Sequence, residues 1–479
     1  MSAAAATGSR APATPAHIPY QFFTTAGYAL MRTILSARLP FDPHDFLLAW
    51  TALLLDGNHL LGITATGDGK SCMFYFALLI MQHFAGQQLK PAGWSWPDNP
   101  MVLVICPTKG IEEEQACIPA LAINEDRLKE ARLKGVDIWA LARLVCILFI
   151  SPEILASVGF ATLLSAVGVQ DRIVLACIDE AHLLLEWSRN FRKAFLQIGQ
   201  LLSRLCPKAR ICALSATVLP GAVEKALCEA LGVFWDDIQI MRRSNLRANL
   251  QFERRMLSSS LTGRSFPELR WIVLERRTAI IFVDSIRTGW RVAAHLCHLL
   301  PHLDAEERRR RIRLYNSLNT ASHNEHTRQL LHGCPGTIAI ATNALCVGFS
   351  PSGVDVVVML DAKSLDEVMQ KGGRANRVPG GTSVGKAILY SSKSARREAA
   401  AVVAADKDGQ NSGSALTPAT KKGRGTAPMD LHLARFITEP CVSIVIKTAY
   451  NNPRQQPCHC TTCGGRPISG VSGPCSCDG

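Results

Sequence analysis

Residues 60–71 of this chain read LLGITATGDGKS, and residues 173–182 read IVLACIDEAH. In the first stretch an apolar strand candidate runs into a glycine-containing loop, and the apolar, helix-like residues 72–81 follow it. A phosphate cradle needs this order of strand, loop and helix, because glycine lets backbone N–H groups turn toward phosphate oxygens. Together the two stretches predict a nucleoside triphosphatase site on an α/β fold, although a Gly-Lys-Ser triplet alone also occurs in loops that bind no nucleotide.

The loop of residues 64–71 has a predicted task for each of its chemical groups. Lys70 is expected to reach the terminal phosphates, and the Ser71 hydroxyl is expected to bind Mg²⁺. The other members of the expected nucleotide cradle are Thr66, Gly67, Asp68 and Gly69. Thr64 occupies the position at which the usual motif has its first glycine, so the match to the motif is incomplete.

The second stretch supplies carboxylates. Its first six residues are continuously apolar, as expected of a parallel strand that is buried on both faces, and Asp179 and Glu180 follow directly. We expect Asp179 to hold Mg²⁺ and Glu180 to orient or deprotonate the attacking water, with His182 as a further catalytic residue. A strand end followed by a solvated acidic turn is the alternative for an Asp-Glu pair alone, but His182 and the upstream loop favour catalysis.

The composition is that of a globular protein and is compatible with a polyanionic partner. The 479 residues allow two domains with cores, 48% of them are hydrophobic, and the net charge of +13 is compatible with a phosphate backbone as ligand. Charge alone is weak evidence, because many basic proteins bind no nucleic acid.

No apolar run approaches the ~20 residues that cross a bilayer, so no membrane association is expected. Residues 1–15 do not resemble a signal peptide, and the scatter of the 17 cysteines suggests a reducing compartment.

Strand candidates alternate with helix-like segments along most of the chain, which predicts parallel sheets. The first series of strand candidates is 60–64, 101–106, 145–150, 173–178 and 211–214, the second is 278–283, 337–341, 354–360 and 387–390, and helix-like segments include 111–134 and 191–205. The expected parts are a disordered lead (1–15), a first lobe (16–245), a second lobe (246–400), a flexible linker (401–429) and a small cysteine-rich unit (430–479). The basic residues 308–311 are expected to be a solvated helix face, with a nuclear signal as the alternative.

Further motifs lie in a fixed order around the two opening stretches. They are residues 107–115 with Pro107 and Thr108, residues 149–153 with Ser151 and Pro152, residues 214–217, residues 280–283, residues 341–344 with Thr342, and residues 370–377 with Gln370, Arg374 and Arg377. In this order they resemble the motifs of DEAH-box helicases of superfamily 2 and, within these, of the RecQ family.

The resemblance implies two RecA-like parallel-sheet lobes that use ATP and Mg²⁺ and move 3′ to 5′ along DNA. Arg374 and Arg377 would close on the phosphate charge that develops during hydrolysis, as arginine fingers do, and Gln370 would contact the nucleotide. The residues that would contact nucleic acid are Pro107, Thr108, Ser151, Pro152 and Thr342. A basic helix start on the surface is the alternative for the two arginines.

Residues 186–192 resemble the aromatic-rich loop with which RecQ proteins sense DNA. Trp187 and Phe191 would stack on bases, and Arg192 is a further expected nucleic-acid contact. The two rings are four residues apart, so an ordinary pair within a helical core is the alternative.

A cysteine cluster near the end of the sequence resembles the zinc module that follows RecQ motor lobes, in which four thiolates hold Zn²⁺. The cysteines that would form it are Cys441, Cys458, Cys460 and Cys463. One interval is a residue shorter than usual, so His459, Cys475 or Cys477 could replace a ligand. A reactive thiol tail is the alternative.

Four positions depart from the family pattern, one of them Arg189, which stands in the aromatic-rich loop where histidine is usual. Leu47 stands where the family has a glutamine that reads adenine, Ser350 where an acid is usual, and Asn376 where glycine is usual, so we expect weaker nucleotide selectivity and weaker coupling of the lobes. The hypothesis is a nuclear ATP-dependent DNA helicase or translocase of repair and recombination. It would act on single-stranded and tailed-duplex DNA, without a strand-separating domain after the cysteines. The alternatives are an RNA-stimulated ATPase and a nucleic-acid-binding remnant without turnover.

Overall fold

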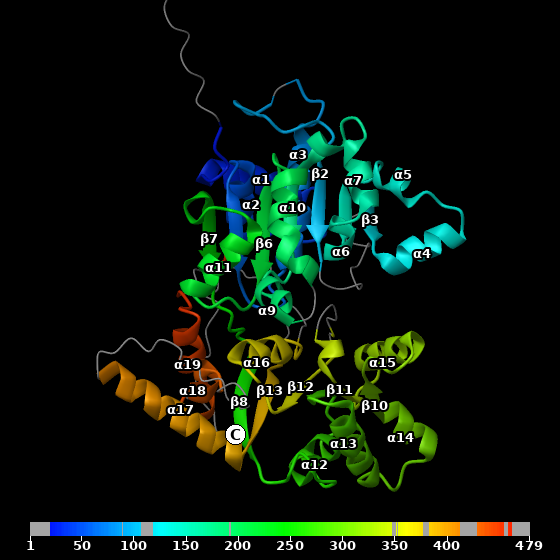
Figure 1. The fold of residues 1–479 in the computed structure, drawn as a ribbon, viewed down its shortest axis with the longest axis vertical. Coiled ribbons are helices and arrows are strands. Elements are labelled where there is room, and N and C mark those ends of the chain that lie inside the picture. The colour runs from blue at the N-terminus through cyan, green and yellow to red at the C-terminus, as the bar shows by residue number, and fades with distance from the viewer. Residues whose placement is uncertain are drawn as a thin grey trace, which may run out of the picture.

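The chain folds into two α/β lobes, which lie one above the other in the computed structural model of Figure 1. The structure describes residues 20–88, 90–106, 118–190, 193–346, 351, 353–376, 383–411, 429–454 and 458–461. Each lobe is built on one sheet, with seven strands in the first and six in the second, and all strand pairs are parallel. This confirms the expected fold class of two parallel-sheet lobes.

The first sheet has the strand order β3-β4-β2-β5-β6-β1-β7. Its strands are β1 (His59–Ile63), β2 (Met101–Ile105), β3 (Ala120–Ile123), β4 (Ile147–Ile150), β5 (Ile173–Ile178), β6 (Arg210–Ser215) and β7 (Ile238–Arg242). Every residue of β5 is buried, because helices cover both faces of the sheet and each position carries an apolar side chain. Strands β1 and β5 both pair with β6, so the two motif-bearing strands end at the same edge of the sheet.

The second sheet has the strand order β10-β11-β9-β12-β13-β8. Its strands are β8 (Leu250–Leu257), β9 (Ala279–Phe282), β10 (Ile312–Tyr315), β11 (Ile338–Ala341), β12 (Val356–Leu360) and β13 (Gly385–Ser392). The segment after α16 (Leu365–Gly372) returns to the amino end of β12, where the Asn376 N–H donates to the Val354 carbonyl at 2.8 Å. This bond places the residues that follow α16 beside the amino end of β12.

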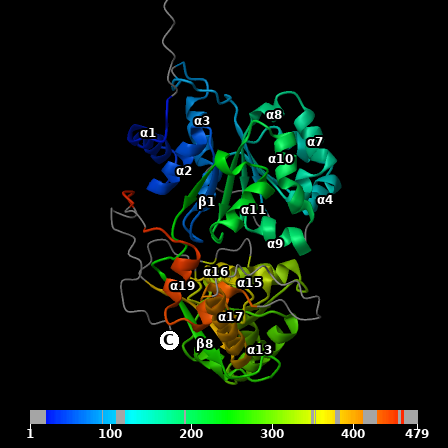
Figure 2. The same ribbon diagram turned by 60° about the vertical axis from the view of Figure 1, so that its left-hand side comes forward.

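Helices cover both faces of each sheet, and α9 and α16 lie on opposite sides of the lobe interface in both views (Figures 1 and 2). The helices of the first lobe are α1 (Thr25–Ser36), α2 (Asp45–Leu55), α3 (Phe76–Phe84), α4 (Glu125–Leu133), α5 (Ile138–Ala142), α6 (Pro152–Leu155), α7 (Val158–Ser165), α8 (Val169–Arg172), α9 (Leu183–Asn190), α10 (Ile198–Leu205) and α11 (Ala222–Leu231). Those that follow β8 are α12 (Arg270–Leu274), α13 (Ile286–His298), α14 (Ala305–Arg311), α15 (Ala321–Gly333), α16 (Leu365–Gly372), α17 (Lys393–Asn411), α18 (Leu431–Thr438) and α19 (Val442–Ala449). No described helix combines the length and the apolarity needed to cross a membrane.

The prediction of a flexible linker was wrong for residues 401–411, because these residues continue helix α17. Ala399 and Val403 on this helix are buried, and Asp406 pairs with Arg435 of α18 at 2.6 Å, so packing extends the helix beyond the expected end of the lobe. The prediction of one helical segment over residues 111–134 was also wrong, because residues 120–123 form the edge strand β3 beside β4.

The described part of residues 430–479 is not a separate unit. Helices α18 and α19 bury Phe436, Ile446 and Tyr450 in the same hydrophobic core as β12 and β13 of the second lobe. The cause is their amphipathic sequence, which places apolar residues on one face of each helix. The basic residues 308–311, in contrast, end α14 at the surface and form the expected solvated helix face.

Candidate active site between the lobes

The phosphate loop leaves β1 and leads through a short 3₁₀ helix, Lys70–Phe74, into α3. Gly67 and Gly69 have φ angles of 90° and 80°, in the left-handed region that glycine adopts without strain. The Lys70 ammonium donates to the carbonyls of Thr64 at 3.2 Å and of Ala65 at 2.9 Å. The ammonium therefore lies inside the loop, where phosphate oxygens could replace these carbonyls as its partners.

Thr64 compensates for the missing first glycine of the motif. The Thr64 side chain is buried, and its hydroxyl donates to the Asp68 carboxylate at 2.5 Å. This bond closes the loop from within, so the incomplete motif still gives a compact turn.

Asp179 and Glu180 follow the carboxyl end of β5. The Glu180 N–H donates to Asp179 Oδ1 at 3.0 Å, and Glu180 has a φ of 48°, a conformation uncommon outside glycine. Burial raises the pKa of Asp179 and the Glu180 carboxylate raises it further, whereas Lys70, the Glu180 N–H and Arg374 lower it, giving a pKa of about 6. A buried carboxylate with an acidic neighbour gains from a bound cation, so this pair suits the predicted Mg²⁺ site.

His182 joins the carboxylates to the second lobe. The His182 Nδ1 lies 3.0 Å from the Ser215 hydroxyl and 3.5 Å from Glu180 Oε2, and its Nε2 lies 3.3 Å from Gln370 Nε2. The same Gln370 amide donates to the Thr217 hydroxyl at 2.7 Å. Burial lowers the pKa of His182, which favours a neutral ring that can accept from the amide. Three motifs from two lobes therefore form one buried hydrogen-bonded chain.

Arg374 lies at the same interface. Its side chain donates to the carbonyl of Cys346, the residue is only 3% exposed, and its charge helps to lower the pKa of Asp179. Just before it in the sequence, the Gly373 carbonyl accepts from the Thr66 hydroxyl at 3.3 Å. The phosphate loop and the last motif are thus in direct contact.

Asn376 fits the position where glycine is usual. It has a φ of 43°, and asparagine is among the residues other than glycine that adopt such angles most readily. Its amide donates to the Asn249 carbonyl at 3.1 Å and to the Ser383 carbonyl. This departure from the family pattern is therefore accommodated by the backbone and the contacts around it.

Arg247, in the connection between β7 and β8, is a site residue that the sequence analysis missed. Its guanidinium donates to the carbonyls of Ala375 and of Asn376, the latter at 3.3 Å. Burial lowers its pKa to about 10, although the nearby Asp68 carboxylate opposes this shift. Arg247 links the phosphate loop to the last motif, and no motif marks it because only the fold brings these segments together.

Leu47, at the position of the usual adenine-reading glutamine, faces the protein interior. It is 1% exposed and belongs to the first-lobe core. A methyl group added at Gly69 would lie 3.7 Å from Leu47 Cδ1, so the side chain packs beneath the phosphate loop. Leu47 thus supports the loop and offers no hydrogen bond to a base.

The predicted nucleic-acid residues are only partly described. Ser151 accepts from the Ile154 N–H as the cap of α6, Pro152 is buried at the first position of that helix, and Thr342 follows β11. Ser151 and Thr342 lie at carboxyl ends of strands in different lobes, and Trp187 belongs to α9. The predicted residues that lie outside the described part of the chain are Pro107, Thr108, Phe191, Arg192, Ser350, Arg377 and Cys463.

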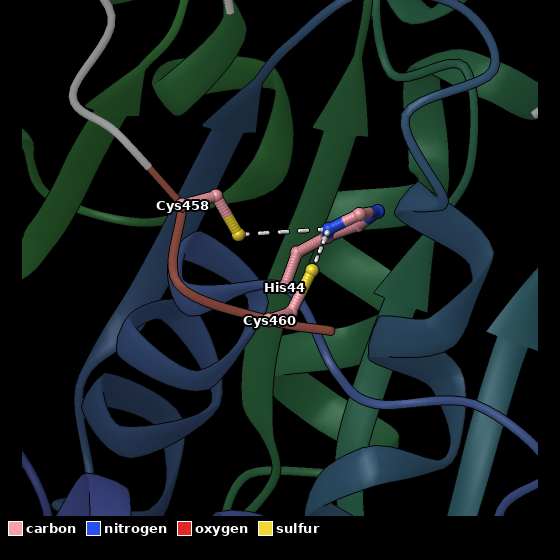
Figure 3. Close-up of side chains that lie close together, drawn as sticks. All are labelled: His44, Cys458 and Cys460. Carbon is pink, nitrogen blue, oxygen red and sulfur yellow. Dashed lines mark hydrogen bonds between the residues drawn. The ribbon is translucent and has the colours of Figure 1, made fainter. Parts of the chain in front are cut away.

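Two of the predicted zinc-binding cysteines meet a histidine from the first lobe (Figure 3). The Nδ1 atom of His44 lies 3.2 Å from the Cys460 sulfur and 3.7 Å from the Cys458 sulfur. Among the described residues, the group at metal-binding distances contains these three side chains and not Cys441, which caps α19 in the second lobe. The four-cysteine set therefore stays a prediction, with Cys441 outside the group that the described residues form, and His44 was missed because it precedes Cys458 by 414 residues.

The charge environment of Cys458 favours a thiolate. Burial raises the pKa of this thiol, but hydrogen bonds from His44, from the Asp45 N–H and from Cys460 lower it to about 6. Deprotonated sulfur is the form that binds metals.

Comparisons with known proteins agree with this geometry. Residues 47–226 match the family described as DEAD/DEAH box helicase. The chain is 25% identical to the ATP-dependent DNA helicase RecQ of Haemophilus influenzae over 67% of its own length and 47% of that protein, and 25% identical to the ATP-dependent DNA helicase Q4 of Mus musculus over 51% and 20%. It thus spans less than half of the length of these two relatives.

Two solved structures share the fold. The DUF1998 helicase MrfA bound to DNA and AMPPNP superposes with a TM-score of 0.56 at 18% identity, covering 76% of this chain and 50% of that one. Dbp5 of S. cerevisiae bound to RNA and ADP BeF₃ gives 0.54 at 16% identity, covering 75% and 86%.

Proposed function

We propose that this protein is an ATP-dependent motor that moves along single-stranded DNA. The proposal starts from the match of residues 47–226 to the DEAD/DEAH box helicase family and from the similarity of the sequence to RecQ. The observation that carries this proposal is the buried chain of contacts from Glu180 through His182 to Gln370. It ties the expected hydrolytic carboxylate to the second lobe. A motor needs such a link, because hydrolysis must alter how the lobes fit together before a bound strand can move.

The residues at the interface fit ATP and Mg²⁺. When bound, ATP would supply the reactive phosphate, and Mg²⁺ would supply positive charge beside it. Lys70 would bind the terminal phosphates, and Ser71 and Asp179 would hold the cation. Glu180 would orient the attacking water and take its proton. Arg374 would stabilise the charge that develops on the phosphate, with Arg377 as a second arginine by resemblance. Zn²⁺ is inferred as a second metal that uses the thiols of Cys458 and Cys460.

DNA is inferred as the track from the similarity to RecQ proteins. Movement from 3′ to 5′ is proposed from the motif resemblance alone. The net charge of +13 suits a phosphate backbone. Ser151, Thr342 and Trp187 would contact the strand on the two lobes. The nucleus, repair and recombination are the proposed setting of the activity.

Two other functions each rest on one observation. An RNA-stimulated ATPase is suggested by the fold shared with Dbp5 bound to RNA. A weakened, nucleic-acid-binding remnant is suggested by Leu47, because this buried side chain cannot read adenine. The contacts of Asn376 favour an active enzyme over the remnant.

The test is ATP hydrolysis by the full chain with single-stranded DNA and with RNA of the same length. We expect turnover that DNA stimulates more than RNA does, and unwinding of a 3′-tailed duplex in preference to a 5′-tailed one. Lys70→Ala should abolish turnover, because the loop loses its phosphate-binding charge. Lys208→Ala, which removes an exposed lysine paired with Asp171, is the matched control and should retain the activity.

Each alternative predicts a different result. If RNA stimulated turnover more strongly than DNA, RNA would be assigned as the track in place of DNA. Nucleic-acid binding without turnover would favour the remnant. Turnover that persists in Lys70→Ala at the original DNA-stimulated rate would reject the site itself.

A further inference from the structure

The segment 458–461 follows helices of the second lobe in the sequence but lies against the first lobe. Helices α18 and α19, which precede it, are buried in the second-lobe core, yet Cys458 and Cys460 lie against His44 at the start of α2 (Figures 2 and 3). The contact therefore joins the two lobes through residues that belong to none of the catalytic motifs.

The three side chains have the spacing of a metal site. Zn²⁺ with bonds of ~2.3 Å to sulfur and ~2.1 Å to nitrogen holds such ligand atoms about 3.6 Å apart when tetrahedral. The two nitrogen-to-sulfur distances here are 3.2 and 3.7 Å, and all three ligand atoms lie within 4.8 Å of one another. Two thiols and one imidazole are a soft donor set that suits Zn²⁺ better than Mg²⁺ or Ca²⁺.

Polar contacts around the cluster hold both sides of it in place. The Asp45 carboxylate accepts from the His459 N–H at 2.7 Å and lies 3.0 Å from the His459 ring, and the Asp42 carboxylate accepts from the Thr461 N–H at 2.8 Å. The Arg32 guanidinium pairs with both carboxylates. The short segment is therefore held by backbone hydrogen bonds on either side of Cys460. These bonds place the two sulfurs beside His44 without help from a metal.

We propose that His44, Cys458 and Cys460 bind one Zn²⁺ ion that fastens this segment to the first lobe, with the fourth position left to water or another donor. This set differs from the four-cysteine module that the sequence resembles, because it replaces Cys441 of the second lobe with a histidine of the first. The metal then does more than stabilise a small unit. It ties the lobes together beside α2, the helix that supports the phosphate loop through Leu47.

The test measures zinc in the purified full chain by elemental analysis after dialysis against metal-free buffer. We expect about one zinc per chain in the wild type, and zinc affinity at least tenfold lower in His44→Ala and Cys460→Ser, since each loses a ligand. Cys441→Ser is the matched control and should keep its zinc. His44→Cys restores a ligand and should also keep it, which separates loss of metal binding from loss of folding.

Cobalt provides an independent readout. Reconstitution with Co²⁺ should give a sulfur-to-cobalt charge-transfer band of the strength expected for two thiolates, unchanged in Cys441→Ser and stronger in His44→Cys. Absence of zinc from the wild type would overturn the proposal. Loss of zinc in Cys441→Ser together with full zinc in His44→Ala would overturn it in favour of the four-cysteine arrangement.

Discussion

Two of the regions in which the described parts of the lobes touch differ in construction. The catalytic seam, made of Thr66, His182 and Thr217 against Gln370 and Gly373, consists of direct hydrogen bonds between buried motif residues. The tail contact, made of Asp42, His44 and Asp45 against residues 458–461, consists of thiols, an imidazole and backbone bonds to carboxylates. The hydrogen bonds of the seam can be exchanged for bonds to water, as the proposed motor would require, whereas the tail contact acquires the strength of metal–ligand bonds if Zn²⁺ binds. One region is suited to movement and the other to restraint.

The largest effect should come from the seam's hydrolytic end. Glu180→Gln removes the proposed base but keeps the shape of the side chain, so turnover should fall by ~10² to 10⁴ while ATP still binds. ATP hydrolysis and binding of a fluorescent ATP analogue measure the two properties separately. Glu130→Gln, at an exposed residue paired with Lys134, is the control and should behave as the wild type. Wild-type turnover in Glu180→Gln would remove Glu180 from the mechanism.

Breaking the seam itself should have a smaller effect. Gln370→Ala removes the contacts to Thr217 and His182, and the loss of buried hydrogen bonds of ~1 to 3 kcal/mol should weaken closure roughly 5- to 100-fold. The DNA stimulation of hydrolysis should fall by up to this factor, and basal hydrolysis should fall less. Gln170→Ala, which removes an exposed amide bonded to the Leu205 carbonyl, is the control. Undiminished stimulation in Gln370→Ala would show that the seam does not couple the lobes.

The smallest effect concerns the link between the two regions. Asp366 of α16 accepts from the Tyr450 hydroxyl just after α19, and burial raises its pKa to about 6, with Asp430 adding to the rise and the Tyr450 bond opposing it. The folded pKa lies above the unfolded value of about 3.9, so this group favours folding below about pH 4 and loses that contribution as the pH rises to about 6. Asp366→Asn should therefore be more stable than the wild type by about 3 kcal/mol at pH 8 and by less at pH 5.

Urea unfolding of both proteins at the two pH values measures this difference. The asparagine oxygen can still accept from Tyr450, so the hydrogen bond itself is preserved. A difference that does not change with pH, or a wild type that is the more stable protein at pH 8, would contradict the assignment of the cost to a buried carboxylate.

The central strands of both sheets were predictable, and the edge strands were not. The predicted β5, β9 and β12 are continuous apolar runs, because parallel strands inside a sheet are buried on both faces. The strands absent from the prediction are β3, β7, β8 and β10, which are the four edges of the two sheets. Edge strands tolerate polar residues; in β8, Glu253 pairs with Lys386 and Arg254 donates to the Phe436 carbonyl.

The site divides in the same way. Lys70, Asp179 and Gln370 lie in local motifs whose chemistry can be read from a few neighbouring residues. Arg247 and His44 act on partners 128 and 416 residues away, and no local pattern encodes those contacts. Leu47 was recognised as a departure, but its role beneath the phosphate loop depends on helix packing and follows only from the structure.

Gly373 shows how narrow the margin for lobe closure is. Its φ of −59° is open to any residue, yet a β-carbon there would lie 2.1 Å from the Thr66 hydroxyl oxygen. Glycine is therefore required by space and not by backbone conformation. A single methyl group at this position would clash with Thr66 of the first lobe. It would therefore raise the free energy of the arrangement in which the lobes meet more than that of either lobe alone. A substitution at this one atom would thus disfavour the joined arrangement of the lobes, without altering any group that the proposed chemistry uses.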